Sequence, residues 1–125
     1  MAEHFDILII GGGPAGLTAA LYARRAGKSV LVLEKAAVGG QIASSPRVEN
    51  FPGILSVSGA ELADRLYEQA DRAGARIELE EVLEVIGQAE REGATIVRLH
   101  TGDPCLNGAI REQMDQLDDL GIAYE

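Results

Sequence analysis

Residues 5–16 read FDILIIGGGPAG, and this stretch decides the fold. An apolar run leads straight into a glycine turn and then into a predicted helix. The run is apolar enough to predict a strand of a parallel sheet that is buried on both faces. The glycines that follow have the spacing of a dinucleotide-binding loop: Gly11 permits the tight turn, Gly13 lets main-chain N–H groups approach a pyrophosphate, and Gly16 allows close helix–strand packing. N–H groups at the start of the helix, together with its dipole, would form an anion site.

An acidic residue stands where such a loop needs one. The second predicted strand, residues 29–33, is followed by Glu34, eighteen residues after Gly16, about where a ribose-binding acid belongs. Pro14 suits the first turn of the helix, because its missing N–H costs no hydrogen bond there. The alternative interpretation is a turn that merely connects a strand to a helix.

Length, charge and cysteine content narrow the class of protein. At 125 residues the chain has room for one domain with a proper core. Its net charge of −9 and isoelectric point near 4.6 argue against binding to nucleic acid or to an anionic membrane surface. The sequence has no apolar stretch long enough to span a bilayer, no signal-peptide pattern and a single cysteine, Cys105, so we expect a reducing, cytoplasmic setting. The oligomeric state stays open.

Strand-like and helix-like segments alternate along the chain. Predicted helices end at glycines that would take the left-handed conformation: Gly27, Gly74, Gly93 and Gly121. The predicted strands, of which the last four follow these glycines, are residues 6–10, 29–33, 75–79, 95–100 and 122–124. This alternation predicts an α/β fold, a doubly wound Rossmann-like three-layer sandwich. Its five-stranded parallel sheet would be ordered 3-2-1-4-5, in a single domain over residues 1–125.

Two segments between these strands have features of their own. The helix after Ser58 opens with a capping box formed with Glu61 and carries apolar residues at helical spacing. Residues 36–57 are far longer than an ordinary βα loop. Their large apolar side chains are Ile42, Val48, Phe51, Ile54 and Leu55. We therefore expect this connection to fold over the C-terminal edge of the sheet.

The N-terminal part of the chain resembles the FAD-binding segment of thioredoxin reductases. The resemblance rests on GGGPAGLTAALYARRAG, VLVLEK, GGQIASSPRVENFPG and SGAELADRLYEQADRAGA, and covers about residues 5–82. It implies FAD as the cofactor, a small-molecule dinucleotide, with the adenosine ribose on Glu34 and Lys35 beside it. Within the loop from Gly11 to Gly16, the residues that it assigns to the pyrophosphate are Gly12, Gly13, Pro14 and Ala15. The residues that it assigns to the flavin side are Gly40, Gln41, Asn50 and Val82.

From about residue 90 the resemblance changes. The stretch GATIVRLHTGDPCLNGAIREQMDQLDDLGIAYE looks like a tetrapyrrole methyltransferase, most like the cobalt-precorrin-4 type. In that family the GDP loop helps to hold S-adenosylmethionine, and the matching residues here are Thr101, Gly102, Asp103 and Leu106. Two positions depart from the family pattern, Cys105 where a small hydroxyl residue is common and Asn107 where an aromatic residue is common.

Two partial families in one chain indicate a deliberately recombined, engineered chimera. Its flavoprotein-like half would be residues 1–82 and its methyltransferase-like half residues 83–125. Around the junction Val82, Val85, Ile86 and Ala89 fall on one helical face, so we predict a helix over residues 81–92. Such a helix would take Val82 out of its flavoprotein setting.

The function expected from this combination is binding without catalysis. Both resembled enzymes need a second domain, and the reductase also needs a CxxC pair, which this sequence does not contain. We therefore expect an FAD-binding module with no catalytic residues, no metal ligands and no enzyme activity. Two alternatives stay open: a ligand-free scaffold, and S-adenosylmethionine binding at residues 101–106. The reactive side chains His4, His100 and Cys105 are interpreted as structural residues or as inert.

Overall fold

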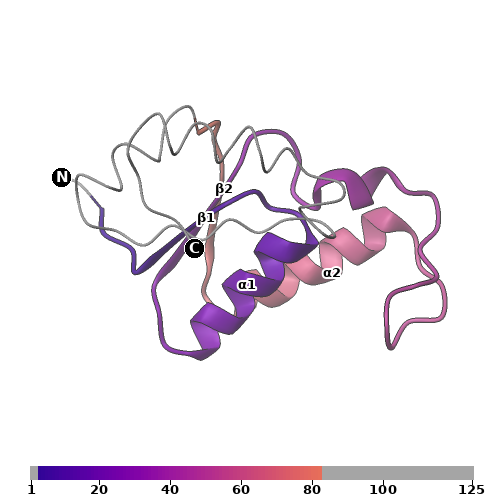
Figure 1. The fold of residues 1–125 in the computed structure, drawn as a ribbon, viewed down its shortest axis with the longest axis horizontal. Helices are drawn as coiled ribbons and strands as arrows, with labels where there is room; N and C mark the ends of the chain where they lie inside the picture. The colour runs from indigo at the N-terminus through magenta and orange to yellow at the C-terminus, as the bar shows by residue number, and fades with distance from the viewer. Residues whose placement is uncertain (1–2, 83–125) are drawn as a thin grey trace, which may run out of the picture. The chain divides into compact units, whose positions relative to one another are not determined.

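The computed structural model describes residues 3–82, which lie within one compact unit, Met1–Val82 (Figure 1). Its strands are β1 (Ile7–Ile10), β2 (Val30–Glu34) and β3 (Arg76–Leu79). Its helical elements are α1 (Pro14–Arg25), the short 3-10 helix η1 (Gly40–Ser44) and α2 (Gly59–Arg72). Strand and helix therefore alternate in this part of the chain as predicted.

The three strands form a parallel sheet in the order β1-β2-β3. Ile7 lies opposite Val30, and Leu31 lies opposite Arg76. These neighbours agree with the first three strands of the predicted order 3-2-1-4-5. The described sheet has three strands rather than five, because the predicted strands at 95–100 and 122–124 lie outside the described residues. The single domain over residues 1–125 stays a prediction for the same reason.

The helix ends follow local signals in the sequence. Gly27 and Gly74 come directly after the C-caps of α1 and α2, with φ of +78° and +92°. The side chain of Ser58 accepts a hydrogen bond from the N–H of Glu61 at 3.1 Å. The capping box is only half formed, because the carboxylate of Glu61 pairs with Arg65 at 2.5 Å instead.

The main core lies between the sheet and the two helices, which pack side by side on one face (Figure 1). Leu17 of α1 and Val32 of β2 are almost fully enclosed. Ile9 joins this core, but its neighbours Leu8 and Ile10 are 48% and 54% exposed. The prediction that this strand is buried on both faces is therefore wrong, because successive side chains alternate between faces and both helices cover the same one.

The long connection between β2 and α2 packs against α2. Val48 and Val57 form an isolated antiparallel bridge, with N···O distances of 2.8 and 3.1 Å, and bury a second apolar cluster together with Leu62. The connection is folded, but its apolar cluster packs against α2, and Gly39 contacts the loop that follows β1 at the predicted edge of the sheet. Its tip is exposed, however, since Leu55 is 95% accessible and Phe51 36%.

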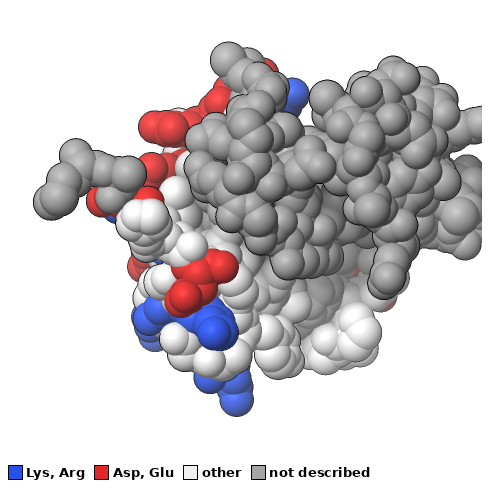
Figure 2. All heavy atoms as spheres, turned by 60° about the vertical axis from the view of Figure 1, so that its left-hand side comes forward, with Lys and Arg blue, Asp and Glu red and all other residues white. Residues whose placement is uncertain are grey.

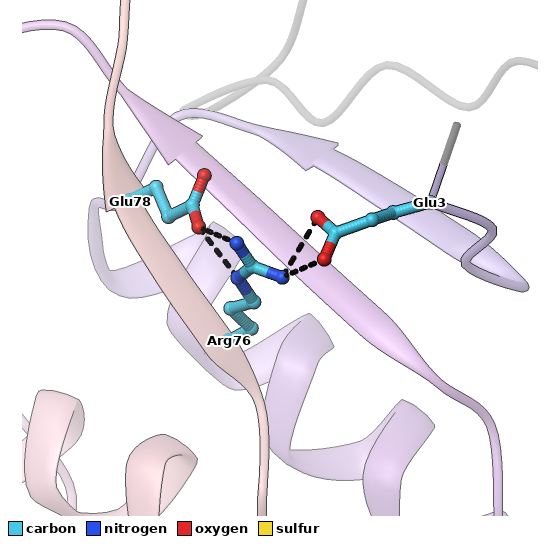
Figure 3. Close-up of polar contacts among 3 residues, drawn as sticks. All are labelled: Glu3, Arg76 and Glu78. Carbon is cyan, nitrogen blue, oxygen red and sulfur yellow. Dashed lines mark hydrogen bonds and ion pairs between the residues drawn. The ribbon is translucent and has the colours of Figure 1, made fainter. Parts of the chain in front are cut away.

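Ion pairs mark the surface of the unit, and acidic and basic side chains meet on the face drawn in Figure 2. Figure 3 shows Arg76 between Glu3 and Glu78, with one guanidinium nitrogen 2.8 Å from both carboxylate oxygens of Glu3. Because Glu3 precedes β1 and Arg76 begins β3, this contact joins the segment before β1 to β3, two segments that β2 separates in the described sheet. Neither helix in residues 3–82 has the length and apolar character needed to cross a bilayer.

Candidate functional site

The loop between β1 and α1 presents main-chain donors that have no partner among residues 3–82. α1 begins without a side-chain cap, with Gly13 as the N-cap residue and Pro14 in the first turn. In residues 3–82 no group accepts a hydrogen bond from the N–H of Gly13, Ala15 or Gly16. Unpaired N–H groups at the positive end of a helix dipole are a ready site for an anion. Residues 11–16, the predicted dinucleotide-binding loop and here called the phosphate loop, thus have the unpaired N–H groups that an anion site needs.

The glycines of this loop are required for different reasons. A Cβ atom at Gly16 would lie 1.9 Å from the carbonyl oxygen of Gly11, so the helix could not pack where it does with any other residue. Among residues 3–82, a Cβ atom at Gly13 would meet one atom within 4 Å, the carbonyl oxygen of Gly39 at 4.0 Å. The space beside Gly13 is thus open, next to unpaired donors, as the approach of a pyrophosphate requires. The residues present fit a bound dinucleotide.

Glu34, the last residue of β2, is fixed beside the loop. One carboxylate oxygen accepts a hydrogen bond from the N–H of Gly12 at 2.8 Å, and the other accepts one from the N–H of Ala36 at 2.9 Å. Each oxygen of an ionised carboxylate can accept a second hydrogen bond, so both can also bind a ribose hydroxyl. The half-buried side chain is held at the position predicted for the ribose-binding acid.

A pocket of about 320 Å³ lies at this edge of the sheet. Its lining residues are Ile10, Gly11, Leu33, Glu34, Lys35, Glu80, Glu81 and Val82. Lys35 is exposed and lies next to Glu34 as expected. Val82 lines the same pocket as Glu34, and residues 81 and 82 are not helical, so the predicted helix does not begin at residue 81. The rest of the predicted helix 81–92 lies outside the described residues.

A second pair of glycines, Gly39 and Gly40, contacts the phosphate loop. The N–H of Gly39 donates to the carbonyl oxygen of Gly12 at 2.7 Å, and a Cβ atom at Gly40 would lie 3.4 Å from the Cα of Gly13. Gly40, which the resemblance assigns to the flavin side, therefore lies against the phosphate loop, and the exposed Gln41 follows it in η1. The sequence analysis missed Gly39, whose φ is +102°. The doublet Gly39–Gly40 is the signal that could have identified it.

The remaining predicted site residues are not joined to this loop. Asn50 is exposed and lines a different, open pocket of about 480 Å³ formed by residues 49–55. The predicted S-adenosylmethionine residues Thr101, Gly102, Asp103 and Leu106 lie outside the described residues. In the described part of the chain no group of three His, Cys, Asp or Glu side chains could hold a metal ion.

Comparison with known proteins identifies relatives over most of the sequence. A model of the family described as FAD dependent oxidoreductase matches residues 6–116. The thioredoxin reductase of Bacillus subtilis (strain 168) is 44% identical over 86 residues, which are 69% of this chain and 27% of that protein. The "34.2 kDa protein in rubredoxin operon" of Clostridium pasteurianum is 54% identical over 76 residues, 61% of this chain and 25% of that protein. The chain thus spans about a quarter of the length of these curated relatives.

Solved structures also show similarity to thioredoxin reductases. The thioredoxin reductase from Streptococcus pyogenes MGAS5005 matches with a TM-score of 0.58 and 45% identity, over 60% of this chain and 24% of that one. The thioredoxin reductase from Giardia duodenalis matches with a TM-score of 0.61 and 39% identity, over 64% of this chain and 26% of that one. A Rossmann-like α/β fold with parallel strands and the predicted resemblance of the N-terminal part are confirmed.

These comparisons correct two predictions that were made from the sequence. The prediction of no enzyme is wrong, because the matching family is one of FAD-dependent oxidoreductases and the relatives include thioredoxin reductases. The methyltransferase fragment and the engineered chimera receive no support. The family match, over residues 6–116, includes the predicted junction around residue 82.

Proposed function

The chain belongs to the family of FAD-dependent oxidoreductases, and from this premise we propose that residues 3–82 bind FAD within an oxidoreductase of the thioredoxin reductase type. FAD, the predicted cofactor, is confirmed as the cofactor of the family. One observation carries the proposal most directly: the unpaired N–H groups around Gly13 face open space beside the carboxylate of Glu34. This arrangement offers donors to a pyrophosphate and acceptors to a ribose within one loop.

Each described group has a part in the proposed complex. The N–H groups of Gly13, Ala15 and Gly16 would bind the pyrophosphate, and Glu34 would bind the ribose of the adenosine half. The pocket that contains Lys35 and Val82 also contains Glu34, so it would receive part of the adenosine half, and Val82 would then contact that half rather than the flavin.

The flavin side of the proposed complex rests on the resemblance together with one contact in the structure. Gly40 is held against Gly13, and this would place Gln41 on the flavin side of the pyrophosphate. Asn50 is assigned to the flavin by the resemblance alone. When bound, FAD supplies hydride and electron transfer, for which the protein provides orientation and electrostatics.

The other interpretations of the sequence, a methyltransferase fragment and a ligand-free scaffold, have weaker support. The family match over residues 6–116 includes most of the segment that resembles a methyltransferase, and none of the relatives reported above is a methyltransferase. A ligand-free scaffold does not explain why Gly13 faces open space, since a side chain there would meet no close protein neighbour. We therefore propose neither S-adenosylmethionine binding nor a scaffold role.

The test is uptake of FAD by the purified chain and by two glycine variants. Gly13→Val fills the open space beside the donors, and we expect the dissociation constant for FAD to rise by about tenfold or more. The control is Gly27→Ala, at the other end of α1, where a Cβ atom meets nothing within 4 Å. We expect the control to lose stability through its positive φ and to keep FAD affinity. Titration calorimetry that detects no FAD binding to the wild-type chain, or equal binding by Gly13→Val, would overturn the proposal.

A further inference from the structure

The first residue of α2 is in close contact with the backbone of η1. A Cβ atom at Gly59 would lie 1.7 Å from the carbonyl oxygen of Ile42 and 2.8 Å from that of Ser45. The N–H of Gly59 donates to the carbonyl oxygen of Ser45 at 2.9 Å. Gly59 does not have a positive φ, so the missing side chain matters for space rather than for backbone conformation. Backbone therefore packs directly on backbone at this point.

Residues 39–45, which contain η1, also contact the phosphate loop. Gly39, which caps η1, donates its N–H to the carbonyl oxygen of Gly12. A Cβ atom at Gly39 would lie only 2.4 Å from the Cβ of Ala63 in α2. Residues 39–45 are thus held between α2 and the phosphate loop, and a shift at one contact must be taken up at the other.

We propose that Gly59 is a positioning residue for the flavin side of the cofactor. Its missing side chain lets α2 hold η1 against the phosphate loop, which fixes Gly40 and Gln41 in place before any cofactor binds. This inference rests on the proposed function. Sites are effective when the groups that contact the ligand are held rigidly by those behind them, and a displacement of about 1 Å is enough to weaken them.

A side chain at Gly59 would move the turn rather than unfold the helix. Cβ atoms do not come within 3.0 Å of such an oxygen, so in Gly59→Ala the carbonyl of Ile42 must move away from α2. α2 has its own supports, since Ser58 caps it and Leu62, Ala63 and Ala70 are buried. We therefore expect Gly59→Ala to fold with η1 displaced.

The experiment compares Gly59→Ala with Gly74→Ala at the other end of the same helix. Gly74 has φ of +92°, and a Cβ atom there would lie 3.0 Å from a guanidinium nitrogen of Arg24, so this control also loses stability. In the absence of FAD, we expect amide exchange of residues 39–45 to be about tenfold faster in Gly59→Ala and within about threefold of wild type in Gly74→Ala. We expect the dissociation constant for FAD, measured by flavin fluorescence, to rise about tenfold in Gly59→Ala only. The emission of the bound flavin should also change in Gly59→Ala and not in the control.

The outcomes separate this inference from the proposed function. If wild type binds FAD, and Gly59→Ala matches Gly74→Ala in exchange and in FAD affinity, the inference is overturned and the proposed function stands. If wild type takes up no FAD, the proposed function is overturned, and the cofactor role of Gly59 with it. Should Gly59→Ala fail to fold, Ile42→Ala replaces it, because it removes the side chain that packs η1 on the cluster around Leu62. The same increases in exchange and in dissociation constant are expected for that variant, and their absence would overturn the inference.

Discussion

The main-chain N–H of Gly12 donates a hydrogen bond to the carboxylate of Glu34 across 2.8 Å. This bond joins the end of β2 to the phosphate loop that follows β1, two segments separated by the whole of α1. A Cβ atom at Gly12 would lie 3.1 Å from the Cβ of Glu34, so the two residues are also packed tightly. The acid predicted to bind ribose therefore also holds the loop in shape without a ligand.

Glu34→Gln should separate these two roles. The amide oxygen can still accept the hydrogen bond from Gly12, but the amide NH2 cannot accept the one from Ala36, and the charge and one acceptor for a ribose hydroxyl are lost. Because hydrogen bonds to charged groups contribute about 1.5–3 kcal/mol, we expect FAD affinity to fall by about tenfold or more. The melting temperature should fall only slightly, because the single main-chain bond that is lost, from Ala36, is exposed. Calorimetry and thermal unfolding measure the two effects, with the exposed Glu49→Gln as the control. Unchanged FAD affinity in Glu34→Gln would show that the carboxylate does not contact the cofactor.

Gly16→Ala should damage the fold, whereas Gly13→Ala should not. The added methyl group at Gly16 would overlap the carbonyl oxygen of Gly11, which must move together with the start of α1. Overpacking of this kind costs about 1–3 kcal/mol of the free energy of unfolding. Gly13→Ala has room for its methyl group and should stay within about 0.5 kcal/mol of wild type. Urea unfolding of both variants tests this difference, and equal stabilities would contradict it.

Local sequence signals were sufficient to predict the first βαβ unit. They could not predict contacts between segments that are distant in the sequence. The loop glycines, the Ser58 cap and the helix stops at Gly27 and Gly74 each depend on a few neighbouring residues, and the structure contains all of them. The need for Gly59 depends instead on the carbonyl oxygen of Ile42, seventeen positions earlier, which no local pattern reveals.

The exposure of Leu8 and the position of Val82 also could not be predicted from local sequence patterns. An apolar strand predicts burial, but which face the helices cover is decided by the crossovers of the whole sheet. The pocket beside Glu34 receives Val82 because the chain continues past β3 at the same edge of the sheet, whereas helical periodicity around residues 81–92 indicated a different path.

The stability of the chain should depend on the ionisation of Asp6. Its carboxylate accepts hydrogen bonds from the N–H and the hydroxyl of Ser29, at 2.7 and 2.9 Å, and these bonds lower the pKa of Asp6 below its ordinary value of 3.8. A depressed pKa in the folded state contributes stability above the unfolded pKa, and this contribution is lost as the pH falls through the folded value. We expect Asp6→Asn to lower the melting temperature at pH 7 and the difference from wild type to shrink below about pH 4. A difference that is constant from pH 7 to pH 3 would contradict this assignment.

Arg24 should stabilise the fold from the end of α1 that lies away from the phosphate loop. Its guanidinium donates to the carbonyl oxygen of Ala73 at the end of α2, at 3.1 Å, and to that of Lys28 after α1, at 2.7 Å. Basic side chains at helix C-termini satisfy carbonyls that have no partner within the helix, and each such bond is worth about 1 kcal/mol or more. Arg24→Met keeps most of the apolar stem and removes both bonds, so we expect a loss of about 2 kcal/mol in the free energy of unfolding.

The neighbouring Arg25→Met is the matched control for Arg24→Met. Arg25 is exposed, lies in the same last turn of α1 and makes no ion pair or side-chain hydrogen bond within residues 3–82. We expect its substitution to change the free energy of unfolding by less than about 0.5 kcal/mol. Because both arginines lie at the far end of α1 from Gly13, neither variant should alter FAD affinity once the protein is folded. Urea unfolding curves that coincide for the two variants would show that Arg24 acts only through its charge near the helix end, which the two residues share, and not through its two carbonyl partners.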